Sequence, residues 1–419
     1  MDNSEKPSEA DPTGKLFVPA LVLAGFAVGL SAPMLSMLTV DISNTFFGNA
    51  SAASLGLVAQ IGTVNSAAEV VFALLMGFLA VRFKSKPLLL LGAVFMFVSA
   101  VGSFFAPNLL SLQFFYALEG GATVIVTINS ATLIGELLPT HKKAKVVSYL
   151  WAIGSVASLA GIPLIGMLTN FGGWRLNFPL MVLPFSALGL IVAYFGLPST
   201  HMKTAVSEAI SGNSYLNAFK QVAKNRSALG CLISGMLGAV GYTGVFAIAF
   251  YRRQFFSSLT AAEQINYAVM IWMVAAVMSI VAAVAMGRIV NKVGAVRLIV
   301  LGGIGNFTCA ILTFVMPSFP LAFTVQMIHV WFFAAALTAW LYVTLDQVPV
   351  ARGTMMSLRT IFSAIGIALG SAAGGLALIT FGSFQAVGVA LAAIIFPGIF
   401  IAYFFIKDPN APSSARING

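Results

Sequence analysis

The sequence has few charged residues and almost no cysteine. Only 8% of its 419 residues are Asp, Glu, Lys or Arg, whereas soluble proteins carry about 25%. A chain of this composition cannot cover a water-facing surface. The two cysteines, Cys231 and Cys309, lie in apolar stretches and indicate neither a disulfide framework nor a metal site. The sequence also contains no nucleotide-binding loop or nucleophilic triad, so we expect no cofactor and no enzymatic activity.

Hydrophobic residues make up 59% of the chain, and their long runs predict membrane-spanning helices. Residues 88–105 and 386–405, for example, contain no charged side chain, and each run is long enough to cross a hydrocarbon core of about 30 Å. No alternating strand pattern competes with this interpretation. We therefore expect an all-α membrane protein with twelve spans, at roughly 17–38, 53–80, 87–107, 110–135, 146–168, 178–197, 227–250, 265–288, 296–316, 320–345, 355–380 and 384–406.

The net charge of +10 follows the expected topology. With the N-terminus inside, 19 of the 22 Lys and Arg residues fall in the tails, in the even-to-odd loops or at the helix ends beside them, and only Arg175, Arg252 and Arg253 fall outside. This bias follows the positive-inside rule and predicts an integral protein of the plasma (inner) membrane with both termini cytoplasmic. It leaves no soluble basic patch for nucleic acid. The expected parts are a cytoplasmic N-tail (1–16), a six-helix bundle (17–197), a cytoplasmic linker (198–226), a second six-helix bundle (227–406) and a cytoplasmic C-tail (407–419).

Two short patterns recur along the chain at one fixed offset. The run 77–82 returns as 287–292, and Glu136 returns as Asp346, each 210 positions later (287−77, 346−136). Because this offset is about half of the 419 residues, it indicates that the chain consists of two duplicated halves. In a chain this hydrophobic, it predicts a membrane transporter built from duplicated helix bundles.

These repeated motifs resemble those of the major facilitator superfamily, and the resemblance covers essentially the whole chain. Residues 77–86 resemble the signature that this family carries between its second and third helices, and residues 287–297 resemble the weaker second copy. The resemblance implies the major facilitator fold, with two pseudo-symmetric six-helix bundles. It also implies secondary transport by alternating access between the two sides of the membrane.

A second pair of motifs resembles the drug:proton antiporter branch of that family. Gly161, Pro163 and Gly166 in the fifth expected helix resemble its G-P-x-x-G element. Residues 171–178, just before the sixth helix, resemble its F-G-W-R-x-x-F element.

Two positions depart from the family pattern. Val81 replaces the acidic residue of the first loop signature, and Tyr116 stands where the fourth helix often has an arginine. In the family, that arginine is associated with proton coupling. Its absence leaves the coupling mechanism open, although it does not affect the fold.

The repeated loop motifs also place opposite charges at one edge of the membrane. A basic residue ends the second and the eighth helix, and an acidic residue ends the fourth and the tenth. If they pair, these residues would latch the cytoplasmic face while the protein opens outward; alternatively, they snorkel and mark the membrane edge. A glycine in each copy allows the helices to approach closely. The residues of this expected gating latch are Gly77, Arg82, Glu136, Gly287, Lys292 and Asp346.

Two acids lie near the middle of apolar helices. Glu69 has Asn65 one turn before it, and Glu119 is followed at four-residue steps by Thr123 and Thr127. A charged residue in mid-membrane costs about 2.5–3.5 kcal/mol on insertion scales and usually faces a cavity. Carboxyl groups shielded from water exchange protons closer to neutral pH. We expect at least one of the two acids to serve proton coupling or substrate binding; alternatively, each is a hydrogen-bonded packing residue.

Three other polar residues are weaker candidates for the transport path. His329, one turn after Gln326 in the tenth helix, is a proton relay or a hydrogen-bonded packing residue. Arg359 lies in the first turns of the eleventh helix, close enough to the inner face to snorkel; alternatively, it contacts substrate. No other basic residue lies deep in a predicted span, so anionic substrates are disfavoured unless Arg359 binds them. Asp41, just past the first helix, is expected to contact water outside.

These features predict a proton-coupled efflux carrier for lipophilic or cationic small molecules. The expected partners are a small-molecule substrate, protons and the lipid bilayer, and the protein is expected to be a monomer. Apolar walls with adaptable Met side chains suit substrates of varied shape. An uptake carrier or uniporter for a small metabolite is the first alternative, since Val81 and Tyr116 replace family residues. A membrane receptor that has lost transport is the second, and the two mid-membrane acids disfavour it.

Overall fold

The computed structural model describes residues 14–138, 140–198, 212–241, 244–349 and 352–408, in some helical stretches for the backbone only. Over these residues every regular element is a helix. The helices are α1 (Phe17–Ser31), α2 (Met34–Phe47), α3 (Ala52–Arg82), α4 (Ser85–Phe105), α5 (Leu109–Leu137), α6 (Thr140–Gly172), the short η1 (Trp174–Leu176) and η2 (Phe178–Val182), α7 (Leu183–Gly196), α9 (Gly212–Lys224), α10 (Arg226–Ala239), α11 (Gly244–Gln254), α12 (Ala261–Val293), α13 (Ala295–Val315), α14 (Phe319–Gln347), α15 (Arg352–Phe381) and α16 (Phe384–Phe405).

The predicted membrane spans coincide with these helices. In the described part, nine helices are long and apolar enough to cross a membrane, or ten if α1 and α2, which meet at 46°, form one bent span. The fifth predicted span corresponds to α6. The seventh corresponds to α10 and α11, which flank residues outside the description. The all-α membrane fold is therefore confirmed.

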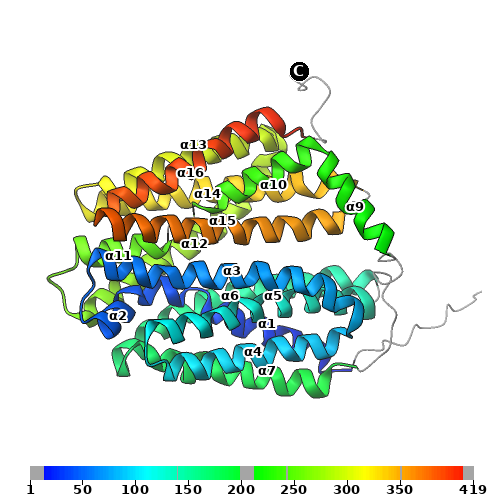
Figure 1. Cartoon of the computed structure of the whole chain (residues 1–419), viewed down its shortest axis with the longest axis horizontal. Coiled ribbons are helices and arrows are strands. Elements are labelled where there is room, and N and C mark those ends of the chain that lie inside the picture. Colours follow the sequence, from blue (N-terminus) through cyan, green and yellow to red (C-terminus); the bar gives the residue numbers. More distant parts are fainter. Residues whose placement is uncertain (1–13, 139, 199–211, 242–243, 350–351, 409–419) are drawn as a thin grey trace, which may run out of the picture.

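The helices group into two halves that follow the sequence. In the first half α4 packs on α5, α3 on α5, and α1 on α6 and α7. In the second half α13 packs on α14 and α16, and α10 on α15 and α16. Figure 1 shows the first half, blue to green, below the second half, which runs from green at α10 to red at α16. The halves meet where α3 lies along α15, α6 along α12, and α2 against α11.

Large apolar side chains cover the outside of both halves. Examples with more than half of their surface exposed are Phe105, Leu110, Phe171, Phe195 and Phe381. A water-soluble protein rarely exposes so much apolar surface, whereas lipid accepts it. Because the backbone groups are hydrogen-bonded within helices, the same surface is compatible with the hydrocarbon interior. The protein is an integral membrane protein.

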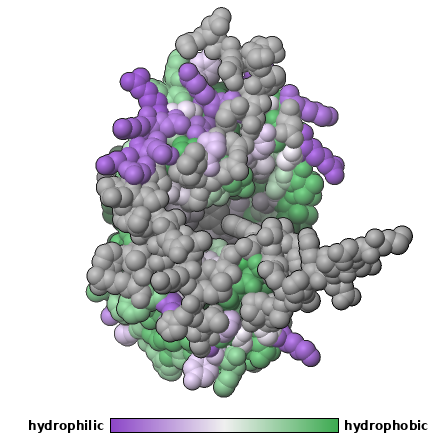
Figure 2. All heavy atoms as spheres, turned by 90° about the vertical axis from the view of Figure 1, so that its right-hand side faces the viewer, coloured by the Kyte–Doolittle hydropathy of each residue, from purple (hydrophilic) through white to green (hydrophobic). Residues whose placement is uncertain are grey.

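The two ends of the molecule differ in how the halves meet. At the end that carries α2 and α11, which we call the closed end, the hydrophobic clusters combine both halves: one contains Leu55 and Phe246, and another contains Met37 and Ile265. At the opposite end, which carries α9 and is called the linker end, each buried cluster of the described residues belongs to one half. Figure 2 looks onto the linker end and shows a hollow between the halves.

Local sequence signals explain where several helices begin. At α5, Asn108 and Ser111 form a capping box, and at α12 Thr260 and Glu263 form another. In a capping box each residue's side chain satisfies a free backbone N–H of the first helical turn. The first cap fixes the start of α5, which carries Glu119. The second fixes the start of α12, which contacts α6 of the other half. Within the expected linker, α9 is helical, and its Val222 packs into the second half.

Candidate functional site: paired acids and a sealed end

The two mid-membrane acids lie side by side on neighbouring helices of the first half. Glu119 of α5 is 8% exposed, and Glu69 of α3 is partly buried. The helices approach closely here because Gly120 has no side chain: an added Cβ would lie 3.3 Å from Glu69 Cγ and would collide with the Asn65 carbonyl oxygen. The two carboxyl groups interact electrostatically. Since like charges repel, a proton bound by one acid stabilises the pair.

Polar groups from three helices surround this pair. The Asn65 side-chain amide donates to the Tyr116 carbonyl oxygen at 2.8 Å and ties α3 to α5. The Ser31 hydroxyl donates to the Val28 carbonyl oxygen at 3.0 Å, and Ser31 lies near Glu119. Ser31 is the last residue of α1, just before the 46° bend into α2. Interrupted helices at mid-membrane commonly form the substrate and coupling-ion sites of transporters. The acids, on α3 and α5, therefore lie beside the bend of the first span.

The threonines that follow Glu119 do not all face the same surroundings. The Thr123 hydroxyl donates to the Glu119 carbonyl oxygen at 3.0 Å, so it is used within its own helix. Thr127, one turn further, is exposed.

The structure places His329 and Gln326 in the second half, on α14, whereas the acids lie on α3 and α5 of the first. His329 is 3% exposed, and its Nε2 atom would lie 3.8 Å from a Cβ added at Gly241, just beyond α10. The Gln326 side-chain oxygen is buried, and no hydrogen-bond partner for it lies in the described part of the chain. Both residues lie within the second half.

The expected gating latch lies largely outside the side chains that the structure describes. This holds for Gly77, Arg82, Glu136 and Asp346, of which only the helical backbone is given. Of its second copy, Gly287 faces open space, and Lys292 is exposed in the last turn of α12. The latch stays a prediction.

The glycines of the fifth-span motif pack against two different helices. An added Cβ at Gly161 would lie 3.2 Å from the Leu30 carbonyl oxygen of α1, inside the first half. At Gly166 it would collide with Val269 of α12, in the second half. Pro163 lies between them, inside α6. The motif therefore serves packing within one half and close contact between the halves.

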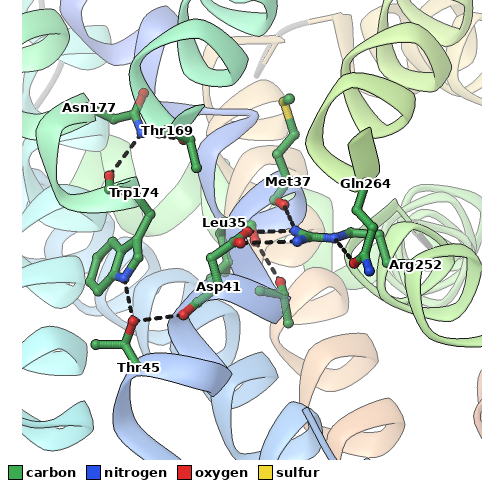
Figure 3. Close-up of polar contacts among 10 residues, drawn as sticks. Leu35, Met37, Asp41, Thr45, Thr169, Trp174, Asn177, Arg252 and Gln264 are labelled. Carbon is green, nitrogen blue, oxygen red and sulfur yellow. Dashed lines mark hydrogen bonds and ion pairs between the residues drawn. The ribbon is translucent and has the colours of Figure 1, made fainter. Parts of the chain in front are cut away.

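An ion pair between the halves seals the closed end, and the sequence did not predict it. Arg252 of α11 contacts Asp41 of α2 through both guanidinium ends, with Nη1 2.5 Å from Oδ2 and Nη2 3.0 Å from Oδ1 (Figure 3). The expectation that Asp41 contacts outside water is wrong, because its side chain is only 15% exposed and that of Arg252 only 2%. Such bidentate pairs are among the stronger charge-assisted contacts.

Further hydrogen bonds surround this pair. Arg252 also donates to the Met37 carbonyl oxygen at 3.2 Å and to the Gln264 side-chain oxygen of α12 at 3.4 Å. Figure 3 shows Thr45, which donates to the Asp41 carbonyl oxygen at 2.9 Å and accepts from the Trp174 indole N–H at 2.8 Å. The network thus links α2 to α11 and α12 of the other half.

One signal could have found this pair in the sequence. Asp41 and Arg252 are 211 positions apart (252−41), within one position of the repeat offset. They therefore end the first and the seventh span, which occupy equivalent places in the two halves. Equivalent positions of a duplicated bundle face each other across the pseudo-symmetry axis.

Comparisons with known proteins agree with this architecture. The sequence profile of the Major Facilitator Superfamily matches residues 17–279 and 254–418. The chain is 23% identical over 395 residues to the uncharacterized MFS-type transporter YwfA of Bacillus subtilis, covering 93% of this chain and 91% of the other. It is 26% identical over 215 residues to the multidrug resistance protein MdtM of Escherichia coli O157:H7, covering 50% of each chain.

Two solved structures share the fold at low sequence identity. A D-xylose-proton symporter superposes with a TM-score of 0.73 at 15% identity, over 94% of this chain and 98% of the other. A mutant of the nucleoside transporter NupG superposes with a TM-score of 0.72 at 12% identity, over 94% and 100%. At these identities the likeness concerns the fold alone.

Proposed function

The chain belongs to the Major Facilitator Superfamily, and we propose that this secondary transporter exports lipophilic small molecules, cationic ones included, in exchange for protons. The observation that carries the proposal is the pairing of Glu69 with Glu119 at the bend of the first span. Among the described residues no basic side chain forms an ion pair with either acid. An acid pair kept in mid-membrane without a cation is costly unless it binds protons or a cationic ligand.

The proposed cycle uses competition between protons and substrate. With the linker end open, the acids release protons and the substrate binds between apolar walls. After the halves rock, the acids rebind protons from the other side, which removes their negative charge and favours substrate release. A ligand can drive such a change only by its different affinity for the two conformations.

The direction of export depends on the orientation of the protein in the membrane. The excess of Lys and Arg predicted for one side supports cytoplasmic termini and a cytoplasmic linker end. The described conformation, sealed by Asp41 and Arg252, is then open to the cytoplasm. We propose that residues 17–197 and 227–406 move as two units, and that the expected latch closes the linker end in the opposite conformation.

Reconstitution in liposomes tests the proposal. A pH gradient is imposed, lumenal pH is followed with a trapped dye, and lipophilic cations, neutral drugs, sugars and organic acids are added in turn. A lipophilic compound is expected to trigger proton movement that Glu119→Gln or Glu69→Gln abolishes. The matched control is Glu263→Gln, an exposed acid at the closed end, which should behave as the unmodified protein.

A uniporter or uptake carrier is the second candidate, supported by one observation. The Tyr116 side chain, which stands where the family often has an arginine, is buried, and its hydroxyl has no hydrogen-bond partner in the described part of the chain. Substrate flux without proton movement, unchanged in both glutamate variants, would refute proton coupling and favour this candidate.

A further inference from the structure

The second half contains a pocket that holds a basic residue. The pocket has a volume of about 60 Å³ and lies between α10, α14 and α15. Its wall includes Arg359, for which the sequence leaves both snorkelling and substrate contact open. Leu337, which also lines the pocket, is 42% exposed. A pocket of this size has room for a small charged group rather than for a whole drug-sized molecule.

The Arg359 guanidinium has no acidic partner in the described part of the chain. Arg359 is partly buried and lies seven residues (359−352), about two turns, after the first residue of α15. A buried cation in a membrane helix is costly and commonly pairs with an acid or marks a ligand site. An anion from outside the chain would balance the charge of Arg359 in this pocket.

Other polar groups line the same pocket. Ser363 lies one turn after Arg359 on α15, and the Thr344 hydroxyl of α14 lies 3.2 Å from the Cys231 thiol of α10. The Trp340 indole N–H is buried without a hydrogen-bond partner among the described residues. Hydroxyl and indole donors beside an arginine are typical of a site for a carboxylate, sulfonate or phosphate.

The rest of the wall is apolar. Leu232, Phe333, Leu337 and Ile367 surround the polar groups. An apolar wall with a few convergent donors is the usual composition of a small-molecule site. The occupant that fits this combination carries an anionic group next to an apolar body.

We propose that this pocket binds the anionic group of the transported molecule, so that the substrates include lipophilic acids and zwitterions. The proposal rests on the proposed transport function and narrows its substrate class. The acid pair of the first half and the arginine of the second half then carry opposite charges. Arg359 binds substrate directly, whereas Glu69 and Glu119 exchange protons.

Binding to the purified full-length protein tests the proposal with two fluorescent probes of similar shape. Anilinonaphthalene sulfonate is a lipophilic anion, and N-phenylnaphthylamine is its neutral parent. Since a hydrogen bond to a charged group is worth at least about one tenfold step in affinity, Arg359→Gln should weaken binding of the anion about tenfold or more. Binding of the neutral parent should change less than about twofold, which also shows that the variant is folded.

Two further variants control for charge and for folding. Arg226→Gln removes an exposed arginine at the start of α10, so it alters the net charge equally and should leave binding of both probes unchanged. Arg359→Lys keeps the charge but loses the planar fork of donors, and is expected to retain part of the preference for the anion. Equal binding of the anion by the unmodified protein and Arg359→Gln would overturn the proposal.

Two additional measurements distinguish a lipid headgroup from a transported acid, and distinguish failure of the pocket from failure of the proton coupling. If phosphatidylglycerol displaces the anionic probe and liposomes show no flux of lipophilic acids, the site belongs to a lipid headgroup, and the substrate assignment is overturned. Arg359-dependent binding of the anion with no proton movement supports the pocket and refutes the proposed coupling. Proton-coupled flux of neutral compounds only, unchanged in Arg359→Gln, overturns the pocket and leaves the coupling intact.

Discussion

The substitution Asp41→Asn is expected to open the closed end of the protein. The asparagine keeps the shape of the side chain but removes the negative charge that faces Arg252. Because Arg252 is only 2% exposed, its charge then stays buried without a partner in the described conformation. When the closed end opens, water can hydrate the guanidinium, so the substitution costs little there. The equilibrium should therefore move toward the conformation that is open at this end.

The size of this shift follows from the burial of the pair. Removing one partner of a buried ion pair costs about 3–5 kcal/mol. The cost is smaller here, since Asp41 is 15% exposed and the asparagine oxygen can still accept one hydrogen bond. A cost of about 2–3 kcal/mol corresponds to a shift of roughly 30- to 140-fold in the ratio of the two conformations.

A cross-link at the same end measures this ratio. The Asn170 side chain of α6 donates to the Asn266 side chain of α12 at 3.0 Å, across the two halves. With cysteines at these two positions, in a protein whose native Cys231 and Cys309 are replaced by serine, disulfide formation reports the closed end. Its rate follows the population of the closed conformation, so Asp41→Asn should slow it severalfold or more.

Two controls decide whether the ion pair causes the effect. Arg253→Gln removes the neighbouring arginine, which is exposed, and should leave the cross-linking rate unchanged. Exchanging the charges, with Asp41→Arg and Arg252→Asp together, should restore part of the rate. The reasoning is refuted if Asp41→Asn cross-links as fast as the unmodified protein, or if Arg253→Gln slows it equally.

Two glycine substitutions test the packing of the helices. Gly166→Val should slow the same cross-link, because a side chain there collides with Val269 of the other half; Gly154→Ala, where an added Cβ meets no atom within 4 Å, should not, and equal rates in both would contradict the predicted contact. Gly102→Ala places a Cβ against the Phe115 ring and should destabilise the protein by about 1–3 kcal/mol, measured as a lower Tm in detergent; an unchanged Tm would show that the ring moves aside freely.

Hydrophobic runs predict the helices of this fold well, because each span must bury its own backbone polar groups in lipid. The break between α1 and α2 is less visible. Ala32 and Pro33 interrupt the first span, and a proline inside an apolar run predicts a kink without its angle. The helix α9 also escapes prediction, since it lies in a stretch whose polar composition resembles a loop.

The candidate site was predictable only where the cost of a buried charge stands out against an apolar helix. Glu69 and Glu119 are conspicuous for this reason, and the structure places them side by side. Asp41 and Arg252 do not stand out in the sequence, because charged residues at span ends normally contact water. Whether a charge near a helix end is buried depends on helices of the other half or on neighbouring spans, which no local pattern encodes.

The seal at the closed end has a consequence for the opposite end of the protein. A carrier must hold its two conformations within a few kcal/mol of each other, since otherwise substrate binding cannot shift the population. A buried pair such as Asp41 with Arg252 stabilises only one of them. Contacts that form when the linker end closes must therefore stabilise the other conformation by a similar free energy. The acid–base motif that recurs at an offset of 210 is the candidate for this role, and neutralising Asp346 should then slow the opening of the closed end.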